Sequence, residues 1–285
     1  MQSRIIDFHT HTFPDHVAPR AVDSLRRSAN TINYLDGTDT SLSVSTKENG
    51  IELSVVLPVA TRLGQAQAIN VASEQKNQMT EQTGLLFFAT VHPDDENIPT
   101  MLSDIKTAGF RGIKLHPVFQ EEYIDGAGYL RLLEKASERD LITVIHAGYD
   151  ISFPDKDFAG VPHILNMIKQ VQPRNVVLAH MGGWNEWDAV ESDLCGADVY
   201  FDTSFCMTPI RPLDPEAENV CKIALGREQF VRIARKHGVD KILFGSDSPW
   251  SKQSEAIDVV RKSGLEEVEI KQILGMNAQK LLGIY

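Results

Sequence analysis

Two histidines near the amino end, in the segment Asp7-Phe8-His9-Thr10-His11, could hold a metal ion. They end a run of β-forming residues, and in a strand the side chains of residues i and i+2 point to the same side. The two imidazoles would then converge on one ion, and neutral imidazole is a common zinc ligand. A lone His-x-His pair fits two histidines at a hydrated strand end equally well, so the prediction needs support from elsewhere in the chain.

That support comes from three polar residues that each follow an apolar run. His146 follows Thr-Val-Ile, His180 follows Val-Val-Leu-Ala, and Asp247 follows Leu-Phe-Gly-Ser. A parallel barrel brings the carboxyl ends of all its strands to one mouth, so these residues would become neighbours of His9 and His11. Unrelated core histidines would have no reason to choose the same strand end each time.

The elements that must position these residues follow a repeated pattern of a short β-rich run, a turn and an amphipathic helical stretch. We predict eight strands, at Arg4–Phe8, Leu53–Pro58, Leu85–Val91, Phe110–Leu115, Ile142–His146, Asn175–Ala179, Val199–Thr203 and Lys241–Gly245. Helical patterns lie at Gln65–Glu81, Asn97–Ala108, Gly128–Arg139, Pro162–Val171, Glu228–His237, Glu255–Lys262 and Glu267–Leu282. Eight such units favour an α/β fold of the (β/α)8 TIM barrel type, with residues 1–285 as one domain. No Gly-rich phosphate loop follows the first strand, which disfavours an open doubly wound sheet.

Two stretches depart from this repeat. Residues 13–43 follow the first strand, and residues 204–225, with three prolines, follow the seventh. Both leave the carboxyl ends of strands, where barrel enzymes build their pockets. We therefore expect both segments to shape the substrate site.

Composition restricts the function classes. The chain has 285 residues, a formal net charge of -11 and 42% hydrophobic residues, which indicates a globular protein and disfavours nucleic acid or anionic membranes as partners. The three cysteines show no Cys-x-x-Cys spacing, which fits a reducing, cytoplasmic location and argues against a thiolate zinc site. No apolar stretch approaches the ~18 residues that span a bilayer, so we expect a soluble, unprocessed protein.

Taken in order, the motifs resemble the amidohydrolase superfamily, in its amidohydrolase-related branch of metal-dependent hydrolases and decarboxylases. The resemblance spans nearly the whole chain and is carried by His9-x-His11, Gly112-Ile-Lys114-Leu-His116-Pro, His146, His180 in His-Met-Gly-Gly, and Gly-Ser-Asp247. It implies a (β/α)8 barrel in which His9, His11, His146 and Asp247 bind a divalent metal, most often zinc. It also implies that His180 stands beside the metal to hold or polarise the substrate, and that Asp247 and His180 are the catalytic pair.

Lys114 leaves the number of metal ions open. In binuclear relatives a lysine of the fourth strand is carbamylated and bridges two metals, which would recruit His146 and His180 to the second ion. The mononuclear branch does without that bridge. As a free ammonium, Lys114 could instead bind a substrate carboxylate as a point charge. We favour one ion, most simply Zn²⁺, and keep the two-metal arrangement as the alternative.

The ligand set is compatible with two reactions. In hydrolysis, Asp247 would take a proton from a metal-activated water that attacks an amide, ester or lactone carbonyl of a small, carboxylate-bearing metabolite. In decarboxylation, the same residues would orient an aromatic or unsaturated carboxylic acid. Those relatives often carry an aromatic residue after the final Asp, whereas this chain has Ser248. We favour hydrolysis on this ground.

Residues predicted to contact the substrate are Lys114, His116, Arg62 and Trp184. A barrel that has decayed into a binding module for a metal or an acidic metabolite is a non-enzymatic alternative. The complete set of histidines and Asp247 argues against decay, because lost function should first erode the proton-transfer groups. We expect a small-molecule substrate and a possible pairing into homodimers, since barrel enzymes often pair through loops such as residues 13–43.

Overall fold

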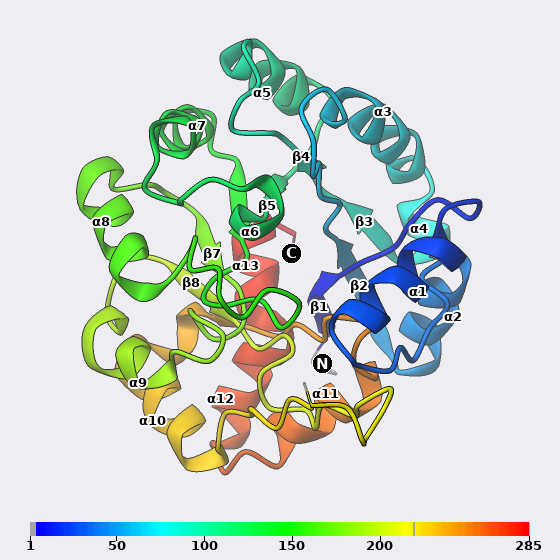
Figure 1. Cartoon of the computed structure of the whole chain (residues 1–285), viewed down its shortest axis with the longest axis vertical. Coiled ribbons are helices and arrows are strands. Elements are labelled where there is room, and N and C mark those ends of the chain that lie inside the picture. The colour runs from blue at the N-terminus through cyan, green and yellow to red at the C-terminus, as the bar shows by residue number, and fades with distance from the viewer. Residues whose placement is uncertain (1–3, 219, 285) are drawn as a thin grey trace.

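The computed structural model describes residues 4–218 and 220–284, and parallel strands occupy its centre with helices around them (Figure 1). The strands are β1 (Ile5–Thr10), β2 (Ile51–Val56), β3 (Leu85–Phe87), β4 (Ala89–Thr90), β5 (Gly112–Leu115), β6 (Ile142–Ile145), β7 (Val176–Leu178), β8 (Tyr200–Asp202) and β9 (Ile242–Leu243). Each predicted strand is found, although several are shorter than expected. The third predicted strand is divided into β3 and β4 at Phe88.

The strands form two parallel sheets, β1-β2-β3 and β4-β5-β6-β7-β8-β9, that join into one ring. At the first join, the amide of Phe88 donates to the carbonyl of Val56 at 2.9 Å. At the second, the amide of Phe8 donates to the carbonyl of Phe244 at 2.7 Å, and the amide of Asp247 donates to the carbonyl of His9 at 2.8 Å. The backbone thus connects the last strand to the first, as a TIM barrel requires.

The helices follow the strands as the sequence pattern predicts. The main ones are α1 (Ala18–Ser28), α2 (Asp39–Glu48), α3 (Ala66–Asn77), α5 (Ile98–Thr107), α7 (Ala127–Glu138), α8 (Val161–Val171), α10 (Arg227–His237), α11 (Gln253–Arg261), α12 (Glu267–Lys271) and α13 (Asn277–Leu282). Short helical turns are α4 (Thr80–Thr83), α6 (Pro117–Gln120), α9 (Trp187–Ala189), the 3-10 turn Val239–Lys241, and the π turns Val190–Leu194 and Gln272–Met276. In the described part of the chain, no helix has both the length and the apolar character needed to cross a membrane.

Two apolar layers hold the barrel together. Alternate strand residues such as Phe8, Val55 and Val144 fill the interior, and Ala278 and Leu282 of α13 pack against them. The opposite strand faces pack under the surrounding helices in a larger cluster. Both strand faces are therefore apolar, which is the burial pattern that parallel strands require.

The two segments expected to depart from the repeat differ from each other. Residues 13–43 contain α1 and the start of α2, which the sequence analysis missed, whereas residues 204–225 hold no helix or strand where they are described. Pro19 lies in the first turn of α1, where a missing amide costs nothing, and the Thr38 side chain caps α2 by accepting from the Ser41 amide.

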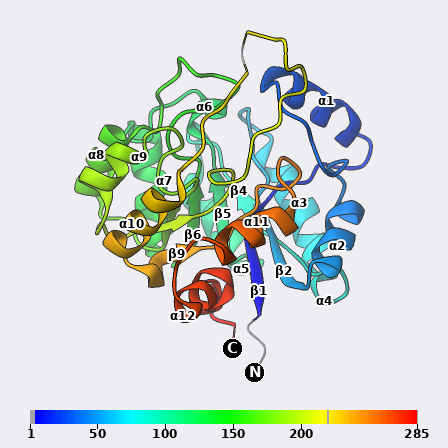
Figure 2. The same cartoon turned by 90° about the horizontal axis from the view of Figure 1, so that it is seen from below.

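The two segments meet above the carboxyl ends of the strands (Figure 2). The amide of Ile32 donates to the carbonyl of Arg211 at 3.0 Å, and the amide of Leu213 donates to the carbonyl of Asn30 at 3.2 Å. The Asn30 side chain also bonds to the backbone of Asp214 in both directions. This pairing fixes α1 over the mouth of the barrel.

Candidate metal centre and substrate cavity

A cavity of about 340 Å³ opens at the carboxyl ends of the strands. Its lining includes all five residues predicted to meet there, together with three of the four predicted substrate-contacting residues: His9, His11, His146, His180, Asp247, Lys114, His116 and Trp184. Arg62 is exposed and lies outside the lining residues. Arg211, a cation of the segment 204–225, pairs with Glu255 through both terminal guanidinium nitrogens.

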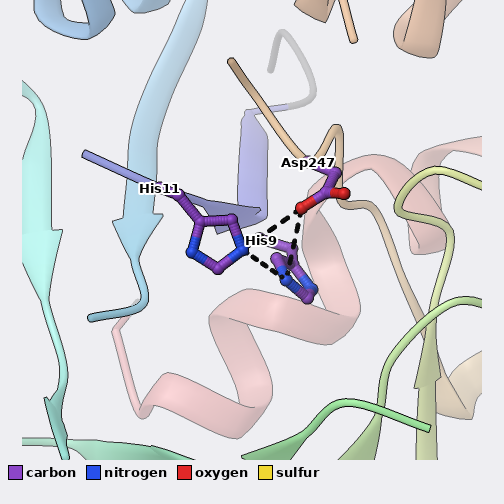
Figure 3. A group of neighbouring side chains, drawn as sticks. All are labelled: His9, His11 and Asp247. Atoms are coloured by element: carbon purple, nitrogen blue, oxygen red, sulfur yellow. Dashed lines mark hydrogen bonds and ion pairs between the residues drawn. The ribbon is translucent and has the colours of Figure 1, made fainter. Parts of the chain in front are cut away.

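His9, His11 and Asp247 form the first cluster, and their side chains point toward one another (Figure 3). Nε2 of His9 lies 3.1 Å from Nε2 of His11, and Oδ1 of Asp247 lies 3.2 Å from Nε2 of His11 and 3.6 Å from Nε2 of His9. Strand β1 supplies the ring of His9, and His11 directly follows the last residue of this strand. The backbone bond from Asp247 to His9 brings the carboxylate beside both rings. Three potential metal ligands therefore converge, as the sequence predicts.

The other nitrogen of each ring is held by an oxygen that can only accept. Nδ1 of His9 lies 2.8 Å from a carboxylate oxygen of Asp202, and Nδ1 of His11 lies 2.9 Å from the carbonyl of Leu57. Both Nδ1 atoms must therefore carry the proton and donate it. Nε2 of each ring then points toward the other ring and toward Asp247.

The same arrangement recurs at His180 and His146. Nδ1 of His180 donates to the carbonyl of Ser204 at 2.9 Å, and Nε2 of His146 donates to the carbonyl of Tyr149 at 3.1 Å. This leaves Nε2 of His180 and Nδ1 of His146 unprotonated, and these two atoms lie 3.0 Å apart. Burial lowers the pKa of both rings, so they are neutral near pH 7.

Lone pairs that face one another at about 3 Å repel unless a cation lies among them. Burial, and then Lys114, lowers the pKa of His9 to about 4, so a second proton on this ring does not remove the conflict at neutral pH. Nζ of Lys114 lies 3.3 Å from Nε2 of His9 and can donate to that one atom. The donor set as a whole has the chemistry of a divalent metal site.

Lys114 is completely buried beside these rings. Burial lowers its pKa to about 8, because the ammonium is poorly solvated there, although Asp202 and Asp247 favour the charged form. The side chain lines the cavity.

A second cluster consists of His116, His146 and Asp150. His116 stacks between Phe119 and His146, with ring centroids 4.0 and 4.1 Å away. An oxygen of Asp150 lies 3.6 Å from Nε2 of His116 and 3.9 Å from Nε2 of His146. His146 thus belongs to this second cluster, and its contact with His180 connects it to the mouth. Its role as fourth metal ligand stays a prediction.

Three carboxylates of the site have roles that sequence reasoning did not identify. Asp202 holds His9 and the backbone amide of His180, and Asp7 accepts from Ser246 and Gln253, which joins β1 to the segment that carries Asp247. Asp150 lines the cavity four residues after His146. Asp202 and Asp7 both lie on strands at buried positions where a carboxylate needs a partner, and that was the only sequence signal.

The backbone at two site residues is in the left-handed region. His180 has φ of 58° and Asp247 has φ of 63°, a conformation that is uncommon outside glycine, although Asp and His adopt it more often than most residues. Both residues lie in the loops that follow strands β7 and β9, and both side chains line the cavity. Local strain of this kind is concentrated at functional sites.

The fold and the site define a metal-dependent enzyme class, and sequence comparison gives the family. The family model described as Amidohydrolase matches residues 6–284, so the chain belongs to this amidohydrolase family. None of the curated proteins matches the chain.

Solved structures with the same fold include enzymes of two reaction classes. A 5-carboxyvanillate decarboxylase from Sphingomonas paucimobilis has a TM-score of 0.66 at 14% identity, with 100% of both chains covered. A probable 2-pyrone-4,6-dicarboxylic acid hydrolase from Acinetobacter baumannii has a TM-score of 0.67 at 16% identity, covering 99% of this chain and 100% of the other. A dihydroxybenzoic acid decarboxylase from a Polaromonas species, which holds manganese, has a TM-score of 0.67 at 14% identity, covering 99% and 97%. At these identities the likeness establishes the TIM-barrel fold, and the reaction must be argued from the site.

Proposed function

We propose that this chain is a metal-dependent hydrolase that cleaves an ester, lactone or amide of a small carbonyl compound. One observation carries the proposal: the rings of His9, His11, His146 and His180 are each fixed by an oxygen acceptor at one nitrogen and direct the other nitrogen into a mouth that also holds the carboxylate of Asp247. This arrangement supports cation binding and places a proton acceptor beside it.

His9, His11, Asp247 and, through Nδ1, His146 would hold one divalent cation, for which zinc is the best match to three imidazoles and a carboxylate. When bound, such a cation supplies Lewis acidity and a water that is acidic enough to lose its proton near pH 7. A second ion held with carbamylated Lys114 is the alternative arrangement. Metal analysis of the purified protein, reported as ions per chain, distinguishes one ion from two.

The chain's own residues have separate tasks. Asp247 accepts the proton from the attacking water at a carboxylate oxygen and returns it to the leaving group. His180, held by the Ser204 carbonyl, presents Nε2 to the substrate side of the site. Lys114 attracts a substrate carboxylate, while the stacked ring of His116 and the indole of Trp184 form walls that exclude water.

Decarboxylation is the second candidate, because the cavity contains a stacked set of flat rings. His116 stacks between Phe119 and His146 in nearly parallel planes, with neighbouring ring centroids 4.0 and 4.1 Å apart, an arrangement that suits a planar aromatic acid. Two of the structural neighbours are decarboxylases of such acids. The absence of an aromatic residue after Asp247 makes hydrolysis the preferred proposal.

A substrate panel tests both reactions on the zinc-loaded protein. Lactones, esters and amides are followed by acid release in a pH-stat, and hydroxylated benzoic acids are followed by release of carbon dioxide. We expect metal-dependent acid release. Carbon dioxide release alone would replace the proposal by decarboxylation, and bound metal with neither product would favour a binding module.

A further inference from the structure

The cavity extends well beyond the polar residues of the mouth. It continues between α1 and α3 over the ends of β2 and β3, where its lining is Leu25, Ala29, Val56, Ile69, Ser73 and Phe87. We call this part the apolar arm. The catalytic steps proposed above use none of these residues, so the arm needs a separate explanation.

The position of α1 beside the apolar arm is fixed by contacts outside the arm. The segment after α1 bonds to residues 211–214, and the amide of Phe13 donates to the carbonyl of Gly37 at 2.8 Å. Both contacts anchor the chain on either side of α1 to segments other than α3. A space between two helices with an apolar lining is unfavourable in water, so it is a place where an apolar ligand gains binding energy.

The charge in the arm is already paired. Lys76 lines its outer part, but its Nζ lies 2.6 Å from a carboxylate oxygen of Asp39 and 4.9 Å from the ring centroid of Phe87. Among the described lining residues, this leaves Lys114 as the cation that can meet a substrate carboxylate. A dicarboxylate would bury its second charge without a partner.

We propose that the apolar arm binds an unbranched alkyl tail, so that the substrate is an elongated ester, lactone or amide with at most one free carboxylate, whose reactive carbonyl lies among the mouth histidines. The inference rests on the proposed function for the reaction, and on the arm for the tail. It predicts that chain length, rather than a second acidic group, controls affinity.

Binding of unbranched alkanoic acids from butanoic to decanoic acid tests the arm without requiring turnover. Trp184 and Trp250 line the same cavity, so their fluorescence reports occupancy of the zinc-loaded protein. We expect the dissociation constant to fall about fourfold for each added methylene until the arm is full. Equal affinity for butanoic and octanoic acids would overturn the proposal.

Matched variants of α3 locate the tail. Ser73→Phe fills the arm and should erase the gain of octanoic over butanoic acid, whereas Ala72→Phe, on the exposed side of the same helix, should leave it unchanged. Ile69→Ala enlarges the arm and should move the affinity plateau to longer acids, which tests the site even if Ser73→Phe does not fold. An unchanged length profile in a folded Ser73→Phe or Ile69→Ala protein would refute the assignment.

Turnover of γ-lactones with increasing alkyl substituents separates the two proposals. Metal-dependent hydrolysis that does not depend on tail length would support the proposed reaction and refute the assignment of the apolar arm to an alkyl tail. Length-dependent binding without hydrolysis of any lactone would support that assignment and refute the proposed reaction.

Discussion

Three of the four histidines compared at the mouth, His9, His146 and His180, are buried, and so is His237 at the end of α10. The hydrogen bonds of the four mouth histidines, which include the half-buried His11, nevertheless differ in kind from those of His237. Each mouth histidine donates from one nitrogen to an oxygen and turns the other, unprotonated, toward another ring. His237 uses both nitrogens on the backbone, since Nε2 donates to the carbonyl of Val199 at 2.9 Å and Nδ1 accepts from the amide of Gly196 at 3.2 Å. Its ring also stacks on Phe201 at 3.7 Å.

This difference shows which property marks a functional histidine. Burial lowers the pKa of His9 to about 4 and that of His237 to about 4 as well, so a lowered pKa does not separate them. The two histidines differ instead in the direction of the lone pair on the unprotonated ring nitrogen. A ring with both nitrogens satisfied stabilises the fold, whereas a ring with one unsatisfied nitrogen aimed at other ligands is prepared for a cation.

The largest effect is expected for Asp247→Asn. The amide keeps the size of the side chain but cannot accept the water proton, so kcat should fall about 10³-fold. Metal content, measured by mass spectrometry of the purified protein, should fall only partly because the histidine ligands remain. Asp15→Asn, at an exposed position, serves as the control. Turnover above a tenth of the wild-type value would remove Asp247 from the proton-transfer step.

Asp202→Asn tests whether Asp202, by holding the proton of His9 on Nδ1, sets the direction of the unprotonated Nε2 of that ring. Burial would raise the pKa of Asp202, but contacts with His9 and then with His180 and Ser204 hold it below its usual range, so the group is an anion that fixes the His9 proton on Nδ1. Its loss should weaken zinc binding by roughly 10- to 100-fold in a chelator competition. Asp198→Asn, whose side chain is fully exposed, should change nothing. Unaltered zinc affinity in a folded Asp202→Asn protein would contradict this role.

His237→Gln tests the other half of the comparison through pH. The folded pKa of about 4 lies below the unfolded value of about 6.5, so the unfolded state binds the proton more readily and stability falls as pH drops from 6.5 toward 4. Between pH 7 and pH 5 this group should cost the wild type about 2 kcal/mol, a loss that the glutamine variant escapes.

Urea unfolding of both proteins at the two pH values measures that difference. The variant is expected to be less stable at pH 7, because it loses the stacking on Phe201, and to bind zinc as the wild type does. A parallel decline of both proteins between pH 7 and pH 5 would show that His237 is not the titrating group, and lost zinc would show that it belongs to the metal site.

The sequence predicted where the strands end better than it predicted which side chains hold the site histidines in place. Apolar runs followed by His146, His180 or Asp247 revealed where strands stop, because burial on both faces leaves a readable signal. Asp202 gave no comparable signal, since its partner His9 lies 193 positions away and only ring closure brings them together. Helix α1 was missed because Pro19 suppresses the helical pattern at the position where a helix tolerates proline.

The smallest effect is expected at Arg62, where sequence and structure disagree about substrate contact. The side chain is exposed and outside the cavity lining, whereas Lys114 is buried within it. Arg62→Ala should therefore change KM for an acidic substrate less than about twofold. Lys114→Met removes the charge from a side chain of similar length and should raise this KM at least tenfold. Steady-state kinetics on an alkanoic lactone with and without a free carboxylate separate the charge from the packing contribution. If Arg62→Ala alone raised KM for the acidic substrate, the loop after β2 would have to close over the cavity during binding.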